Sequence, residues 1–382
     1  MPTRISDLPE YTTITGSAFV PIVDVNELLA SKNKKIRIDD LRKYFFTGTT
    51  TSSSFTEHTP GFYYFGDNSD GALNLTGSLT NIRTFVSRSF ASTQDGVPII
   101  KNFSSLFISR SVVVSPTNRC RGMLIFVDGD ATISGSLRMT GRGASAVGTD
   151  ASFTTINPPY LGDYWSTQLF PSASYLSRVF AVGAAAGATV GPSSGLSLAG
   201  NPGLAGVFGR SGGGGSGTAF QGSGVSTVGS AGTSFSGGSG GGGSNPARAG
   251  TSAAANGGAG GNGSESGGGG AGNPNGTGGT AVGEGTGGLL ILIVRGNLRI
   301  GPNGSIAVNG ITGNTAPGPS GGGGGGSGGG ILYVYYGGTL TNNGTVTSNG
   351  GSGGSASTVT SGAGGAGTAI LSKLNVAFPA GN

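Results

Sequence analysis

"GGGGGGSGGGILYVYYGGTLTNNGTVTSNGGSGG", residues 321–354, places six apolar or aromatic residues between two runs of glycine. A continuous apolar run of this length, bounded by turn residues, indicates a strand that is buried on both faces. Burying the side chains of Ile331 to Tyr336 contributes on the order of 10 kcal/mol. Ordering the glycine-rich residues 321–330 costs about the same, because glycine loses more backbone entropy than any other residue. The fold therefore depends on whether such glycine runs are packed.

This stretch is one copy of a repeat. "GMLIFVDGDATISGSLRMTG" (122–141), "GLLILIVRGNLRIGPNGSIAVNG" (288–310) and "GILYVYYGGTLTNNGTVTSNG" (330–350) align with one small gap. Each contains a long apolar strand, a short strand after a glycine, and a last strand in which apolar and variable residues alternate. One such unit cannot cover its own apolar face. The repeat predicts a mostly β fold, either β-solenoid-like coils or stacked hairpins, in which the last strand is buried on one face only.

The glycine tracts between the repeats allow two interpretations. They could be disordered linkers, or extended chains packed so closely that only glycine fits where the backbones meet. Part of the spacing is three-fold, as at Gly257, Gly260 and Gly263, and the tracts carry almost no charge, which is unusual for a disordered linker. These features favour packed polyglycine layers, and the linker alternative stays open.

The charges are few and unevenly placed. The 382 residues carry a formal net charge of +5, yet the only acidic residues after Asp163 are Glu265 and Glu284. The glycine-rich half has no cluster of Lys and Arg with interleaved aromatics, which argues against nucleic-acid binding. A lone cysteine, Cys120, excludes an intramolecular disulfide. The longest apolar run, Leu289 to Val294, is too short to span a bilayer, so we expect a soluble chain without membrane insertion.

The chain divides into a small N-terminal module and a larger β-repeat body. The module is predicted to be α+β, with strands at Phe19–Val23 and Lys35–Ile38 and a short helix at Asp40–Phe45 that Asp39 caps. The predicted regions are residues 1–47 (the module), 48–60 (a Ser/Thr-rich linker), 61–151 (a first β-repeat region), 152–200 (an aromatic insertion) and 201–382 (a glycine-rich β-repeat domain).

Several stretches resemble proteins of tailed bacteriophages. "RISDLPE", "AFVPIVD" and "NKKIRIDDLRKYF" resemble the N-terminal module by which many tail fibres join the virion. "YYFGDNSDGALNLTGSL" (63–79), with the strand repeats and glycine tracts, is similar to a glycine-rich β-repeat domain of phage tail proteins. The alternation of polyglycine with variable loops also resembles glycine-rich tip adhesins, in which polyglycine helices display receptor-binding loops. This chain departs from those adhesins in its long apolar strands and its N-terminal module.

The resemblance implies a virion protein of the phage tail, assembled in the host cytoplasm, that mediates attachment to the host surface. Its implied partners are other tail or baseplate proteins, a host cell-surface glycan or outer-membrane protein, and further copies of the chain, with a homotrimer expected. The residues expected to attach it to the virion are Leu8, Pro9, Phe19, Pro21, Ile22, Ile36, Ile38 and Leu41. The alternative is a purely architectural virion protein, such as a head fibre, decoration or baseplate component without receptor contact.

The candidate receptor-binding residues are aromatic. Exposed aromatic rings stack on sugars and supply rigid contact area, and the insertion concentrates several of them. They are Tyr160, Tyr164, Trp165, Phe170 and Tyr175. The competing interpretation is that they form a local core of the insertion. Phe220 and Phe235 are isolated in glycine-rich segments, so each either plugs a layer or meets a ligand.

No catalytic or metal-binding pattern stands out. Glycoside cleavage needs two carboxylates that flank the scissile bond. Asp128 and Asp130 are the nearest match, although a polar turn explains them as well. His58 is the only histidine, which argues against a His-based triad or a zinc site. We therefore expect no enzyme, no cofactor and no bound metal.

Overall fold

The structure is a computed structural model of the whole chain, and its backbone falls into two compact units, residues 1–55 and 56–382, which are described separately. The boundary lies inside the predicted linker 48–60. The structure describes the following residues: 19–23, 33–37, 65–76, 86–145, 185–188, 199–206, 211–219, 227–233, 235–253, 260–266, 268–280, 283–355 and 360–373.

The described part of the first unit is a pair of strands. β1 (Phe19–Val23) and β2 (Asn33–Arg37) run antiparallel, with Phe19 opposite Arg37. Both predicted strands are confirmed, and β2 begins two residues before its predicted start. The predicted helix at 40–45 lies outside the described residues.

The second unit contains three parallel sheets of five strands each, and the chain visits the sheets in turn. The first sheet contains β3 (Ala72–Leu75), β6 (Ser105–Ile108), β9 (Ala131–Ile133), β12 (Leu298–Ile300) and β15 (Leu340–Asn342). The second contains β4 (Val86–Phe90), β7 (Val112–Pro116), β10 (Ser136–Arg138), β13 (Ser305–Ala307) and β16 (Thr345–Thr347). The third contains β5 (Ile99–Phe103), β8 (Met123–Val127), β11 (Leu289–Val294), β14 (Ile331–Tyr336) and β17 (Thr368–Lys373).

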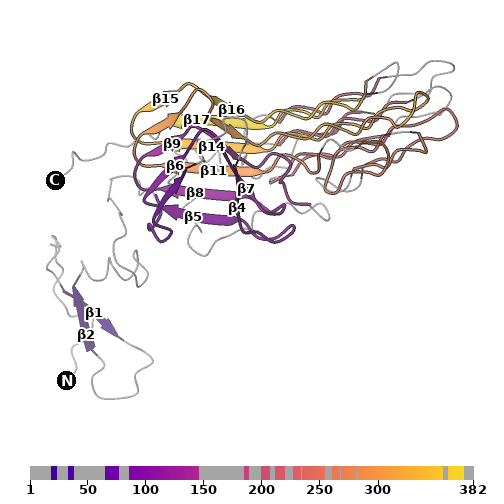
Figure 1. The fold of residues 1–382 in the computed structure, drawn as a ribbon. Coiled ribbons are helices and arrows are strands. Elements are labelled where there is room, and N and C mark those ends of the chain that lie inside the picture. Colours follow the sequence, from indigo (N-terminus) through magenta and orange to yellow (C-terminus); the bar gives the residue numbers. More distant parts are fainter. Residues whose placement is uncertain are drawn as a thin grey trace. The chain divides into compact units, whose positions relative to one another are not determined.

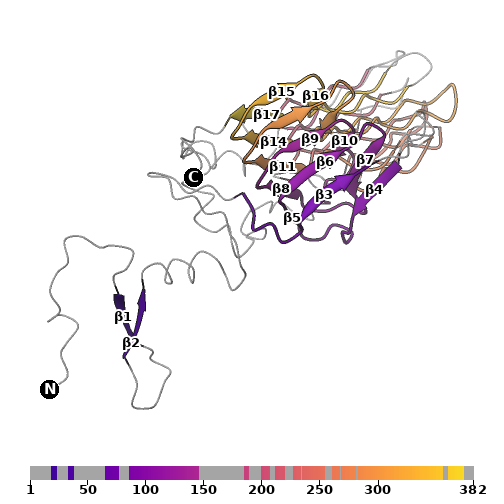
Figure 2. The same cartoon turned by 60° about the vertical axis from the view of Figure 1, so that its left-hand side comes forward.

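Every three consecutive strands therefore make one coil of a β-solenoid-like body, and Figure 2 shows β15, β16 and β17 at one end of the stack and β3, β4 and β5 at the other. All strand pairs between coils are parallel, which excludes stacked hairpins in the described residues. Strands from the regions predicted as 61–151 and 201–382 share all three sheets, so the two regions form one body.

The three aligned repeats occupy successive coils in register. Leu290 lies between Met123 and Leu332 in the third sheet, as the alignment of the repeats requires. The strands before the first aligned repeat, β3 to β7, continue the same registers, although their sequences do not show the full repeat. The solenoid-like prediction is thus confirmed, and the repeat extends further than the sequence indicates.

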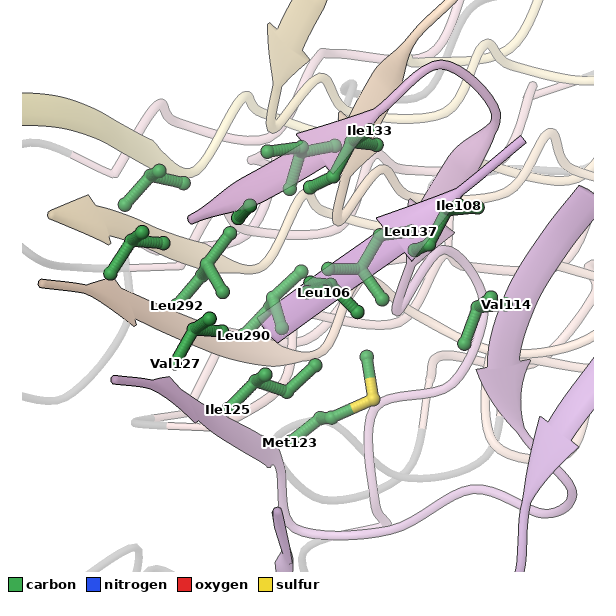
Figure 3. Close-up of a cluster of buried hydrophobic side chains, with 14 of the residues drawn as sticks. Leu106, Ile108, Val114, Met123, Ile125, Val127, Ile133, Leu137, Leu290 and Leu292 are labelled. Atoms are coloured by element: carbon green, nitrogen blue, oxygen red, sulfur yellow. The ribbon is translucent and has the colours of Figure 1, made fainter. Parts of the chain in front are cut away.

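The core lies between the three sheets, where aliphatic side chains from each coil stack on those of the next (Figure 3). Inward residues such as Ile125, Leu292 and Val334 are at most 1% exposed. The outward residues of β11 and β14 are also almost all buried, which confirms the prediction that the long apolar strands are buried on both faces. Along β10 only the middle residue, Leu137, is buried, as expected for a strand that faces the core on one side.

The glycine tracts are insertions at a single corner of the solenoid, between the second and third sheets. In the first two coils this corner is short, residues 91–98 and 117–122. In the next three coils it consists of residues 139–288, 308–330 and 348–367. Their described parts extend away from the strands as long, closely spaced chains (Figure 1). We call the described residues of these insertions beyond residue 184 the glycine lattice.

Hydrogen bonds connect the chains of the lattice with a three-residue period. In residues 211–219, successive N–H groups donate to three different neighbouring chains, and successive carbonyls accept from three others. The first neighbour is segment 321–330, where the carbonyls of Gly329, Gly326 and Gly323 accept from Gly212, Gly215 and Thr218, respectively. The second is segment 199–206, where Leu204 and Asn201 accept from Gly213 and Ser216. The third is segment 227–233, where Ser230 and Thr227 accept from Gly214 and Gly217. Three further chains donate to the carbonyls of this segment. Gly238, Gly241 and Ser244 donate to Gly212, Gly215 and Thr218, respectively. Gly365 and Gly362 donate to Gly213 and Ser216, and Gly187 donates to Gly214.

The layers of the lattice follow the order of the coils. Residues 360–367 lead into β17, residues 321–330 into β14 and residues 283–288 into β11. Gly329 donates to Gly365 (2.9 Å), and Gly287 donates to Gly328 (3.1 Å), so neighbouring layers are hydrogen bonded as the strands are. The described glycine segments are therefore packed, which decides against the linker interpretation for these residues.

Candidate functional site

The lattice holds a set of loops at its free end. Gly330 precedes β14, so residue 321 lies at the end of that chain away from the strand. Thr218 donates to Gly323 (3.2 Å), which places the end of segment 211–219 at the same level. Ser244 in turn donates to Thr218 (3.1 Å). The connections that follow these chains therefore lie at the free end of the lattice.

Three of these connections are described: residues 245–250, the turn around Glu265, and residues 315–320. The first is fixed by Asn245, which is 7% exposed and accepts at Oδ1 from the backbone N–H of Ala247 (3.0 Å) and Arg248 (2.6 Å). Because both ends of each connection continue into hydrogen-bonded chains, the loops need little further ordering when a partner binds.

The charged groups at this end are exposed. The Arg248 guanidinium lies 3.7 Å from the Glu265 carboxylate, and their side chains are 73% and 78% exposed. An ion pair this exposed contributes little to stability, so both groups stay available to a partner. With the exposed Pro246 and Pro317 they form a small, rigid and polar surface suited to binding. Within the described ranges, no group of His, Cys, Asp and Glu side chains could hold a metal ion.

The predicted receptor-binding residues divide into one that is described and six that are not. Phe235 is 4% exposed, and the Arg121 guanidinium lies 5.9 Å from its ring centroid. The sequence allowed Phe235 either to fill a layer or to meet a ligand, and in the structure its ring is buried inside a layer. Six candidates lie outside the described residues: Tyr160, Tyr164, Trp165, Phe170, Tyr175 and Phe220.

The virion-attachment candidates belong to the first unit, and the structure describes four of the eight. Four of them are strand residues: Phe19, Pro21 and Ile22 in β1, and Ile36 in β2. The others lie outside the described residues: Leu8, Pro9, Ile38 and Leu41.

Asp128 and Asp130 connect one coil to the next. The Asp128 carboxylate accepts from Arg295 Nε (2.9 Å) and from Asn68 Nδ2 (3.0 Å). The Asp130 carboxylate accepts from the backbone N–H of Asn297 (2.6 Å). These contacts match the polar-turn interpretation.

An ion cluster around a buried arginine, at the corner of the solenoid, was missed by the sequence reasoning. The Arg119 side chain is 8% exposed and pairs with both Asp95 (3.3 Å) and Glu284. Asp95 also accepts from the backbone N–H of Ser145 (2.8 Å). Both ends of insertion 139–288 are thereby fixed to the first two coils. The separation of Arg119 and Glu284 by 165 residues leaves no local signal for this contact.

Two groups near this corner have perturbed pKa values. Burial raises the pKa of the Cys120 thiol, which donates weakly to the carbonyl of Gly122 (3.4 Å). Burial, helped by the nearby Arg142, lowers the pKa of Arg138. Neither group faces a cluster of catalytic side chains, so we assign them structural roles.

Comparisons with protein-family models, with curated proteins and with solved structures found no match to this chain. None of the described segments is a helix of the length and hydropathy needed to cross a bilayer.

Proposed function

We propose that the chain is a structural protein of a bacteriophage virion, a tail fibre or tail-attached adhesin that mediates attachment to the host surface. The observation that carries this proposal is the glycine lattice. It is built on one corner of a solenoid and presents loops at its far end. A rigid support of this kind suits a protein that must hold binding loops away from the particle.

The N-terminal unit is proposed to attach the chain to other tail or baseplate proteins. Residues 1–47 resemble such a module, and the pair β1–β2 supplies an antiparallel ribbon on which it can be built. We also propose that the chains of the glycine lattice are layers of polyglycine-type helices. The three-residue hydrogen-bond period of segments 211–219 and 321–330 supports it.

The partner at the host is proposed to be a cell-surface glycan or an outer-membrane protein. A polar loop surface with an exposed arginine and glutamate can bind either by hydrogen bonds and charge. We propose that binding occurs without catalysis, because the carboxylates of Asp128 and Asp130 are engaged by Arg295 and by the backbone of Asn297.

Competition for phage adsorption tests the adhesin role. Purified wild-type chain, added to susceptible cells before the phage, is expected to reduce adsorption in a dose-dependent way. Gly318→Arg puts a bulky cation into the open space of the loop at residues 315–320, where an added Cβ would have nothing closer than 4.0 Å. We expect it to weaken the competition at least tenfold. Val97→Arg adds the same charge at a site that is 72% exposed on the solenoid corner and should compete like wild type.

The result separates the adhesin from an architectural protein. Competition by wild type and by Val97→Arg, but not by Gly318→Arg, supports recognition through the free end. A wild-type chain that does not compete, together with antibody labelling confined to the capsid, would replace the adhesin proposal with the architectural one.

A further inference from the structure

The last coil of the solenoid ends in an open surface. β15, β16 and β17 are each the final strand of their sheet, so one edge of each is without a neighbouring strand among the described residues. Core-facing side chains of this coil are only half buried, as at Leu340, Val346 and Leu371. An unpaired edge above an incompletely covered core favours pairing with another chain.

The same surface continues onto the glycine lattice. The layer at the level of β17 consists of residues 199–206, 360–367 and 348–354, held by bonds such as Gly203 N–H to Ala363 O (2.9 Å) and Gly364 N–H to Gly351 O (2.8 Å). We call this layer together with β15, β16 and β17 the C-terminal face.

The exposed side chains of this layer are uncharged: six are apolar, and Asn349, Ser352 and Thr360 are polar. Leu204 is 60% exposed, and Pro202, Ala363 and Ala366 also face outward. The outer layer on the other side of the lattice differs. Its chains, residues 251–253, 260–266 and 276–280, expose mainly hydroxyl, amide and carboxylate side chains: Thr251, Ser252, Asn262, Glu265, Thr277 and Thr280. The lattice is therefore amphipathic, with its apolar side on the C-terminal face.

The two ends of the solenoid also differ in charge. Among the described residues of the C-terminal face, Lys373 is the only charged one. At the other end of the solenoid, Arg88 is exposed and is the register partner of the core residue Val114 on the next strand. Lys101 forms an ion pair with Asp70 (2.5 Å). A head-to-tail stack would bury the exposed Arg88 against a face without acidic side chains among its described residues, so the C-terminal face fits a copy of itself better than it fits the opposite end.

We propose that the C-terminal face is the surface through which two copies of this chain associate about a two-fold axis. A second copy supplies the same surface, whose described residues include one charged side chain, Lys373, and a two-fold pairing closes instead of forming an open filament. Other occupants fit less well. Membrane surfaces are bound by large apolar side chains flanked by Lys and Arg, and sugars are bound by aromatic rings. The described part of this face has one lysine and no exposed aromatic cluster.

The size of the face is consistent with such a pair. Eight extended residues at about 3.1 Å each span roughly 25 Å, and three chains about 5 Å apart add roughly 15 Å of width. The lattice layer alone thus offers on the order of 400 Å², about half of the ~800 Å² that each partner of a stable complex contributes. The last coil must supply the rest, so we expect an interface that includes both parts. This inference is independent of the proposed virion role.

Light scattering coupled to size-exclusion chromatography tests the proposal on the full chain between about 1 and 100 µM. Wild type is expected to have the mass of two copies. Leu204→Glu and Ala366→Glu, made separately at exposed positions, should each weaken self-association at least tenfold. Thr277→Glu, on the polar side of the lattice, should leave it unchanged. Circular dichroism verifies that each variant is folded.

A second measurement avoids added charge. The chain has one cysteine, and it is buried, so Ala366→Cys introduces the only exposed described thiol. A bifunctional maleimide is expected to cross-link Ala366→Cys into a two-chain product and to leave Thr277→Cys uncross-linked. Wild type with the mass of one copy or of three copies would overturn the proposal, as would self-association that neither glutamate weakens. Wild type that is monomeric but binds neutral phosphatidylcholine vesicles would also overturn it, because the face would then be a lipid-binding surface.

Discussion

An added methyl group distinguishes two kinds of glycine in this chain. A Cβ at Gly325 would overlap the carbonyl oxygen of Gly215, because the two backbones are in contact within the lattice. A Cβ at Gly318 would meet nothing closer than 4.0 Å. The composition alone shows a glycine-rich chain, and only the packing separates the residues that must be glycine from those that need not be.

We therefore expect Gly325→Ala to lower the free energy of unfolding by about 3 kcal/mol or more, since neither backbone can move without breaking the surrounding hydrogen bonds. Gly318→Ala should change it by less than about 0.5 kcal/mol. Urea unfolding followed by circular dichroism measures both. Equal stability of the two variants would show that the chains are not packed as described.

Cys120 gives a pH-dependent prediction at the same scale. Burial raises the pKa of its thiol in the folded chain, so the unfolded chain releases this proton first as the pH rises. Its contribution to stability is complete below the ordinary cysteine pKa of about 8.5 and is lost as the pH rises through the folded value.

Unfolding measured between about pH 7 and 10 should show a stability loss of up to ~1.4 kcal/mol per pH unit that Cys120→Ala lacks. The comparison with Cys120→Ala removes the contribution of tyrosines and lysines, which titrate in the same range. Parallel pH profiles for the two proteins would mean that the thiol is not buried in the native state.

Individual elements are held by contacts that differ greatly in burial. The two glutamates of the glycine-rich half both form ion pairs, yet Glu284 meets an arginine that is 8% exposed and Glu265 meets one that is 73% exposed. In the sequence both glutamates lie in glycine-rich tracts. The structure makes one of them the contact that closes the base of the longest insertion.

Glu284→Gln is expected to lower the free energy of unfolding by about 1–3 kcal/mol, because it leaves a buried guanidinium with only Asp95 as its charged partner. Glu265→Gln should cost at most about 0.5 kcal/mol. Chemical unfolding of the two variants side by side measures the difference. A loss at Glu265 as large as that at Glu284 would contradict the assignment of the buried cluster as the contact that fixes the insertion.

Sequence patterns predicted the elements that bury apolar side chains. Ile331 to Tyr336 and Leu289 to Val294 form the expected strands, because a long apolar run has few other ways to leave water. The sequence does not show the first coil as a copy of the repeat, since its strands carry polar residues such as Lys101 and Arg88 in rows that face the core elsewhere. The first coil tolerates these polar residues because one side of a coil at the end of the stack faces solvent.

For the molecule as a whole, the sequence predicted a repeat body with packed glycine layers but not their arrangement. Which corner carries the insertions, and which chain lies beside which, depends on contacts between residues up to 170 positions apart. The amphipathic character of the lattice is likewise invisible in sequence, because alanine and threonine rows appear only when chains such as 360–367 and 276–280 are placed in layers. The candidate loops follow from that placement.

Hydrogen–deuterium exchange of the full chain tests most directly whether the glycine lattice is an ordered structure that supports its loops. Amides of residues 211–219 and 321–330 donate to neighbouring chains in the lattice interior and should be protected for as long as those of β14. Peptides from residues 245–250 should exchange faster. Exchange of 211–219 and 321–330 within seconds, at the rate of an unstructured glycine linker, would contradict the account.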